Sequence, residues 1–66
     1  KPILVEIKST KNRPTSDRLA SFVRIGREFK GSEMVLLSRA EEAAIINGVD
    51  CLRWDLGLRK IFGLPL

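Results

Sequence analysis

The sequence predicts an α/β domain with a small, mainly parallel sheet. Two stretches with strand character, residues 2–8 and 33–38, flank a stretch of helical periodicity at residues 16–29. A strand, a helix and a strand at this spacing are typical of a parallel unit with a right-handed crossover. A third strand at residues 49–54 and a final helix at residues 55–62 complete the predicted order β-α-β-(α)-β-α.

The length and composition suit one small domain that spans residues 1–66. A chain of this size buries only about 60% of the surface that its unfolded form exposes. The single cysteine, Cys51, and the absence of histidine exclude an internal disulfide and zinc sites built on these residues. We interpret Cys51 as a small buried apolar residue. Because the chain starts at Lys1 without Met, we expect a C-terminal fragment of a larger protein.

The charge balance favours anionic partners. The net charge is +4 and the pI is about 9.9, so DNA is a reasonable partner. No apolar run approaches the ~20 residues of a membrane span. We therefore expect no membrane partner and a cytoplasmic location, which agrees with the lone cysteine.

The first strand, residues 2–8, has aliphatic residues at its odd positions and two charged residues on the other face. Glu6 and Lys8 are two positions apart, so they share a face at a separation of about 6–7 Å. Charges on an otherwise apolar strand are costly to bury unless they are paired, metal-bound or at a sheet margin. Two interpretations remain open: half of a metal-dependent nuclease site, or an ion pair that blunts an exposed edge.

Basic residues gather between this strand and the next helix. Lys8, Lys11, Arg13 and Arg18 fall at the end of the strand, in a polar connection and in the first turn of the helix. Helix N-termini attract phosphate, and added cations strengthen that attraction. The functional interpretation is a contact with phosphate or a nucleic-acid backbone, and the alternative is a solvated loop.

The helix at residues 16–29 has an apolar stripe with a glycine in its middle. Thr15 or Ser16 can cap its start. Gly26 lies on the stripe, where glycine costs about 1 kcal/mol against alanine. We expect that Gly26 allows a close approach of this helix to the sheet.

The strand at residues 33–38 is nearly all apolar, which predicts a strand covered on both faces. Ser38 and Glu41 then form a capping-box pattern, which predicts a short helix from Ser38 to about Ile46. The alternative is a hairpin around Asn47-Gly48.

The C-terminal part predicts a third strand followed by an amphipathic helix. Asp55 is expected to cap this helix and Gly63 to end it. Trp54, Leu58 and Phe62 are expected to close a small core, the alternative being a patch that docks a partner.

Several segments together resemble a known family. They are Val-Glu-Ile-Lys-Ser-Thr at residues 5–10, the amphipathic helix with Phe22, Met-Val-Leu-Leu-Ser at residues 34–38 and Val-Asp-Cys-Leu-Arg-Trp at residues 49–54. The chain resembles the C-terminal restriction-endonuclease-like domain of AAA-type ATPases of unknown function, within the PD-(D/E)XK nuclease-like superfamily. The resemblance covers nearly the whole chain, and the Glu-x-Lys-Ser strand is its sharpest part.

The resemblance implies a partial restriction-endonuclease-like fold and a partial active site. Residues 2–8 would be the strand that bears the Glu-x-Lys motif, so Glu6 and Lys8 would be catalytic and Glu6 would be the metal ligand. The family places an Asp on the strand before this one, whereas Asp17, Asp50 and Asp55 all follow Glu6. Mg²⁺ would then be held weakly, and this chain alone would not cut DNA.

The resemblance also implies partners. The family carries an ATPase domain, but this chain has no Gly-x-x-x-x-Gly-Lys-Ser/Thr motif, so ATP would bind only in a parent domain that is absent here. We expect a non-catalytic nuclease-like module that contacts nucleic acid or regulates the attached ATPase. The alternatives are a Mg²⁺-dependent endonuclease active only in the full-length parent, and a structural α/β fragment. One sheet edge should be open to another copy or to a segment of the parent.

Overall fold

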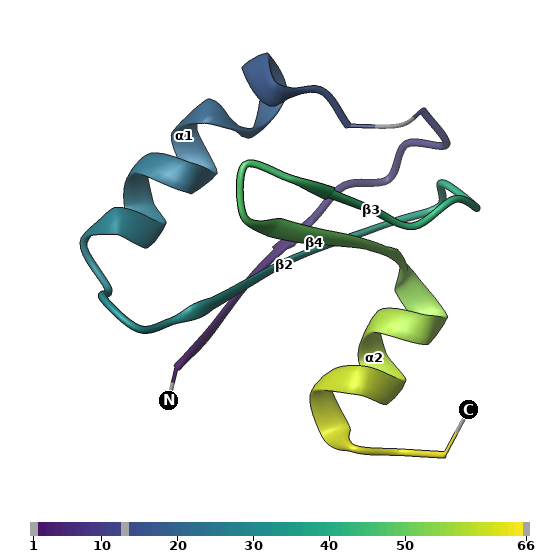
Figure 1. The fold of residues 1–66 in the computed structure, drawn as a ribbon. Coiled ribbons are helices and arrows are strands. Elements are labelled where there is room, and N and C mark those ends of the chain that lie inside the picture. The colour runs from purple at the N-terminus through teal and green to yellow at the C-terminus, as the bar shows by residue number, and fades with distance from the viewer. Residues whose placement is uncertain (1, 13, 66) are drawn as a thin grey trace.

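The computed structural model describes residues 2–12 and 14–65. These residues form a four-stranded sheet with α1 on one side and α2 on the other (Figure 1). The elements in chain order are β1 (Ile3–Ile7), α1 (Ser16–Arg27), β2 (Glu33–Ser38), β3 (Ala44–Ile46), β4 (Val49–Arg53) and α2 (Trp54–Phe62). The α/β class predicted from the sequence is confirmed.

The sheet is mixed but mainly parallel. Its strand order is β1-β2-β4-β3. β1 pairs in parallel with β2, β2 pairs in parallel with β4, and β3 is antiparallel to β4. The carboxyl ends of β1, β2 and β4 therefore lie at the same end of the sheet. The outer strands are β1 and β3.

The main core lies between the sheet and α1. Its buried members come from α1, β2 and β4: Leu19, Phe22, Leu36, Val49 and Cys51. The Cys51 side chain is 2% exposed, and burial, followed by the charge of Asp50, raises the pKa of its thiol. A thiol of this kind stays protonated and unreactive, so Cys51 is confirmed as a buried apolar residue.

Helix α1 begins and packs as the sequence predicts. Thr15 is its N-cap, and the Thr15 Oγ accepts a hydrogen bond from the Arg18 N–H at 3.4 Å. A Cβ added at Gly26 would collide with the Sδ of Met34 on β2. The Met34 side chain therefore fills the space that Gly26 leaves free, and the expected close approach of the α1 backbone to the sheet stays a prediction. The helix ends at Arg27, two residues earlier than expected.

The short helix predicted from Ser38 to Ile46 is wrong, and the hairpin alternative is confirmed. Asn47 and Gly48 have φ values of 50° and 80°, as a two-residue turn of type I′ requires. The Ser38 Oγ accepts the N–H of Ala40, two residues on, at 3.1 Å, so it forms a local turn instead of a helix cap. β3 consequently pairs with β4.

The start of α2 differs by one residue from the prediction. β4 ends at Arg53 and α2 begins at Trp54, so Arg53 is the N-cap and Asp55 lies within the first turn. The expected cap at Asp55 is therefore wrong. Gly63, with φ 66°, ends the helix in the left-handed conformation as predicted.

Helix α2 contacts the sheet through a glycine and leaves its larger apolar side chains exposed. A Cβ added at Gly57 would collide with Leu37 of β2. Trp54, Leu58 and Phe62 are 52%, 37% and 70% exposed. The prediction that these three side chains close a core is therefore wrong, because the face of α2 that carries Gly57 makes that contact instead.

Candidate functional site

The candidate site lies where the parallel strands end. Lys8 directly follows β1, Ser38 ends β2 and Arg53 ends β4. In α/β sheets, ligands bind outside the carboxyl ends of the parallel strands. The chain therefore presents polar side chains at the carboxyl end of the parallel strands, where binding sites most often form.

Glu6 and Lys8 lie on the same face of the β1 segment, as the sequence predicts. The Lys8 Nζ is 3.4 Å from a Glu6 carboxylate oxygen, and the two side chains are 46% and 38% exposed. Ion pairs of this exposure contribute about 0–1 kcal/mol to stability. The pair is therefore accessible to a ligand and of little consequence for the fold.

The described residues do not by themselves provide a magnesium site at Glu6. Within residues 2–12 and 14–65, no three His, Cys, Asp or Glu side chains cluster in a way that could hold a metal ion. The Glu6 carboxylate instead faces the ammonium group of Lys8. Because Mg²⁺ is usually held by one or two carboxylates plus substrate phosphates, the metal-ligand role of Glu6 stays a prediction that needs donors from outside these residues.

A hollow of about 250 Å³ lies between the end of β1 and the start of α1. Its walls combine two cations, two polar side chains and an apolar floor: Lys8, Arg18, Thr10, Asn12, Pro14, Leu19 and Leu36. The backbone N–H of Asn12 donates to the Thr10 Oγ at 3.1 Å, which bends the connection around the hollow. The site therefore combines positive charge with a partly enclosed surface.

Helix α1 adds its own field to this hollow. Its first residue is Ser16, and Arg18 lies in its first turn. The N-terminus of a helix carries a partial positive charge and attracts anions. The charges of Lys8 and Arg18 and the dipole of α1 therefore act in the same sense.

The other predicted contact residues fall outside this hollow. Lys11 is exposed in the connection between β1 and α1 and does not line the hollow. Arg13 lies outside the described residues. Of the predicted basic residues, the structure thus brings together Lys8 and Arg18.

Arg39 is a basic residue of this region that sequence reasoning missed. Its guanidinium donates to the Ser9 carbonyl at 3.1 Å, and its backbone N–H donates to the Thr10 carbonyl at 3.0 Å. These bonds tie the end of β2 to the connection that forms the hollow. The signal that could have found Arg39 is its place immediately after a buried parallel strand.

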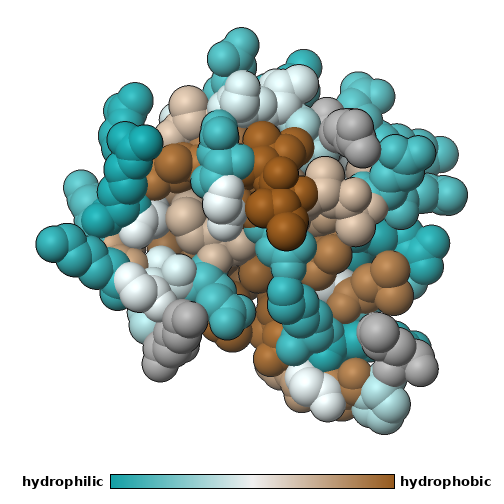
Figure 2. Space-filling model, viewed as in Figure 1, coloured by the Kyte–Doolittle hydropathy of each residue, from teal (hydrophilic) through white to brown (hydrophobic). Residues whose placement is uncertain are grey.

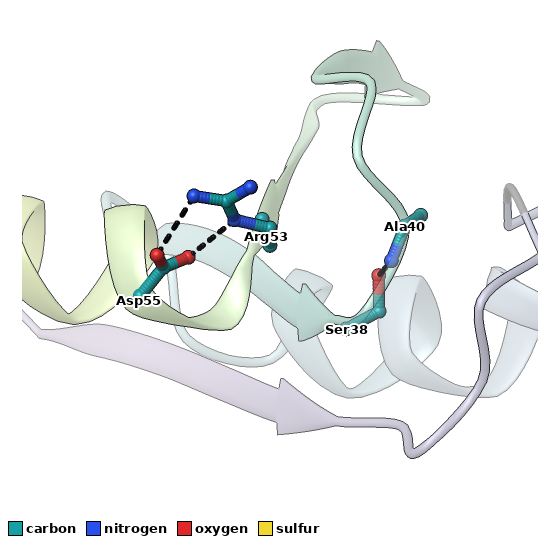
Figure 3. Close-up of polar contacts among 4 residues, drawn as sticks. All are labelled: Ser38, Ala40, Arg53 and Asp55. Atoms are coloured by element: carbon teal, nitrogen blue, oxygen red, sulfur yellow. Dashed lines mark hydrogen bonds and ion pairs between the residues drawn. The ribbon is translucent and has the colours of Figure 1, made fainter.

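Arg53 lies at the same end of the sheet, but its charge is paired (Figure 3). Its Nε and a terminal nitrogen donate to the two Asp55 carboxylate oxygens at 2.7 and 2.8 Å. The hydrogen bond from Arg53 lowers the pKa of the Asp55 carboxyl, and the same bond raises the pKa of the guanidinium. Arg53 therefore fixes the junction of β4 and α2. It does not line the hollow, whose cations are Lys8 and Arg18.

Comparison with protein families, curated proteins and solved structures finds no match to this chain. Across the described part of the chain, neither helix is long and apolar enough to cross a membrane.

Proposed function

We propose that this chain is a nuclease-like module that contacts the phosphate groups of nucleic acid and does not cut them by itself. The observation that supports this best is the hollow shared by Lys8 and Arg18 at the carboxyl end of β1 and the amino end of α1. Lysine and arginine bind phosphate through charge-assisted hydrogen bonds. The net charge of +4 adds a long-range attraction to the same ligand.

The apolar floor of the hollow also supports a phosphate contact. Leu19 and Leu36 are each 1% exposed and form part of its wall. Positive charges beside a low-dielectric wall act on an anion more strongly than the same charges in open water. Glu6 partly offsets this effect, because its carboxylate pairs with Lys8.

Salt-dependent DNA binding tests the proposal. Fluorescence anisotropy with labelled single-stranded and duplex oligonucleotides gives the affinity at several salt concentrations. We expect Lys8→Gln and Arg18→Gln each to weaken binding and to reduce the salt slope by about one phosphate contact. Arg24→Gln is the matched control, because Arg24 lies on α1 but lines a different depression beside Asn47.

Two outcomes would contradict the proposal. One is a salt slope that is the same in the two variants and the parent chain. The other is an equal loss of slope in Arg24→Gln, which would indicate general charge attraction without a site.

The Glu6–Lys8 pair favours a second candidate, a Mg²⁺-dependent nuclease in a larger protein. Its support is the common face and the 3.4 Å separation of the two side chains, together with the family resemblance. A Mg²⁺ titration followed by NMR tests this candidate without relying on activity. We expect Mg²⁺ to change the NMR signals of Glu6, and we expect this change to disappear in Glu6→Gln. Unchanged signals in the longer protein, with supercoiled plasmid left intact, would rule this candidate out.

The regulation of an attached ATPase rests on the family resemblance alone. The test is the ATP hydrolysis rate of the longer protein with and without residues 1–66. An unchanged rate would remove this part of the proposal and leave the phosphate contact standing.

A further inference from the structure

β1 is an outer strand whose backbone hydrogen bonds divide cleanly between its two edges. The Lys8 N–H donates to the Leu37 carbonyl at 2.9 Å, and the Pro2 carbonyl accepts from the Glu33 N–H at 2.9 Å. In a parallel pair, alternate residues of a strand make the bonds to the neighbour. The even-numbered residues of β1 therefore bond to β2.

The odd-numbered residues consequently direct their backbone groups to the free edge. Ile3, Val5 and Ile7 each direct an N–H and a C=O away from β2. Their side chains are also accessible, at 40%, 41% and 73% exposed. Among the residues that the structure describes, these backbone groups find no partner, so the outer edge of β1 combines them with a row of β-branched side chains. A surface of this kind adds another strand.

This row is symmetric about its centre. Reading Ile-x-Val-x-Ile in either direction gives the same residues, with Val5 at the middle. An antiparallel copy of β1 would therefore place Ile3 opposite Ile7 and Val5 opposite Val5. We propose that two copies of this chain associate through β1, antiparallel and centred on Val5, to form one continuous sheet.

The charges on the other face of β1 select this register. Centring the pair on Glu6 would place two carboxylates directly opposite each other, which is destabilising. Centring it on Leu4 would leave Ile7 without an apolar partner. Centred on Val5, each Glu6 lies opposite Leu4 and keeps its own Lys8 at 3.4 Å. The junction then contains two carboxylates and two ammonium groups, with no net charge.

The opposite edge of the sheet is a weaker candidate. β3 has three residues against five in β1. Its Ile45 is 78% exposed. In the view of Figures 1 and 2, β3 lies at the front, and a hydrophobic patch occupies the middle of the surface. β3 therefore offers apolar surface but fewer backbone groups, which makes it the matched control for β1.

Sedimentation of the 66-residue chain from micromolar to millimolar concentration tests the association. We expect a concentration-dependent dimer whose dissociation constant rises at least about tenfold in Val5→Lys, because two ammonium groups would then face each other. Ile45→Lys should leave the constant unchanged. Circular dichroism verifies that both variants are folded. A chain that stays monomeric, or a dimer that is indifferent to Val5→Lys, would overturn the proposal.

Cysteine crosslinking tests the register separately. Residues that face each other in a hydrogen-bonded antiparallel pair have Cα atoms about 5.5 Å apart, which a disulfide spans. With oxidised glutathione, Val5→Cys should crosslink to itself, and Ile3→Cys should crosslink to Ile7→Cys faster than either does to itself. Native Cys51 is buried and stays unreactive. Crosslinking of Ile45→Cys at the rate of Val5→Cys would show that the association does not use β1.

Discussion

At the scale of the residue, two glycines mark the points where the helices contact the sheet. Gly26 of α1 lies against Met34, and Gly57 of α2 lies against Leu37. Both glycines are buried inside helices, where the residue type itself is unfavourable. The sequence points to Gly26, because a glycine on an apolar helix face needs a packing reason, but it does not predict the contact at Gly57.

A double-mutant cycle tests the contact at Gly26. Gly26→Ala should leave the free energy of unfolding nearly unchanged, because displacing the flexible Met34 thioether offsets the gain in helix propensity. In a Met34→Ala background the same change should instead raise it by about 1 kcal/mol. Urea denaturation measures both values. Equal effects in the two backgrounds would show that Met34 does not limit the space at Gly26.

The Arg53–Asp55 pair predicts a pH dependence of stability. The pKa of Asp55 is lowered in the folded chain by its hydrogen bond to Arg53. The pair therefore stabilises the fold above the ordinary Asp pKa of about 3.9, and this contribution is lost as the pH falls through the lower folded-state value. We expect Asp55→Asn to lower Tm at neutral pH and to show a smaller further fall below about pH 4. Parallel curves for both proteins would contradict this assignment.

Part of the candidate site follows from local sequence and part does not. Glu6 and Lys8 share a face because side chains alternate along any strand. The pairing of Lys8 with Arg18 around one hollow depends on how α1 sits over the end of β1, which is a tertiary feature. Arg39 joins the site through the Ser9 carbonyl, thirty positions away in the chain. The spacing of residues in the sequence does not predict a contact of this kind.

At the scale of the element, the hairpin of β3 and β4 shows how tertiary pairing decides between two local signals. Ser38 and Glu41 match the start of a helix, whereas Asn47 and Gly48 match a tight turn. Ile45 and Ile46 are β-branched, which disfavours a helix and favours a strand. The backbone pairing with β4 decides the outcome, so this segment needed the three-dimensional context that the other strands did not.

Substitutions at Gly48 test the turn. Gly48 has φ 80°, and an added Cβ would meet no other atom there. Gly48→Ala should therefore lower stability by about 1–2 kcal/mol through backbone strain alone. Gly48→Asn should lose less, because asparagine tolerates this conformation. Urea denaturation compares the two variants, and an alanine variant as stable as the parent would exclude a left-handed residue at this position.

At the scale of the whole molecule, β2 is the centre of the fold. It lies between β1 and β4, and Val35, Leu36 and Leu37 are each at most 2% exposed. The sequence predicts this position from an unbroken apolar run. It does not predict that the odd-numbered side chains of β1 stay accessible, because that depends on where α2 lies over the sheet.

Amide hydrogen exchange tests this hierarchy. The amides of β2 should exchange most slowly, since they open only with the whole sheet. Those of β3, at an edge and three residues long, should exchange faster. NMR in deuterated buffer measures the rates, and equal protection in β2 and β3 would contradict a core centred on β2.

The contact of Met34 with Gly26 also makes the fold sensitive to oxidation. Met34 is the one thioether of the chain, and its sulfur occupies the place that a methyl group on Gly26 would take. A sulfoxide would add a polar oxygen at this point. Peroxide treatment should therefore loosen α1 from the sheet, and reduction of the sulfoxide should restore the packing.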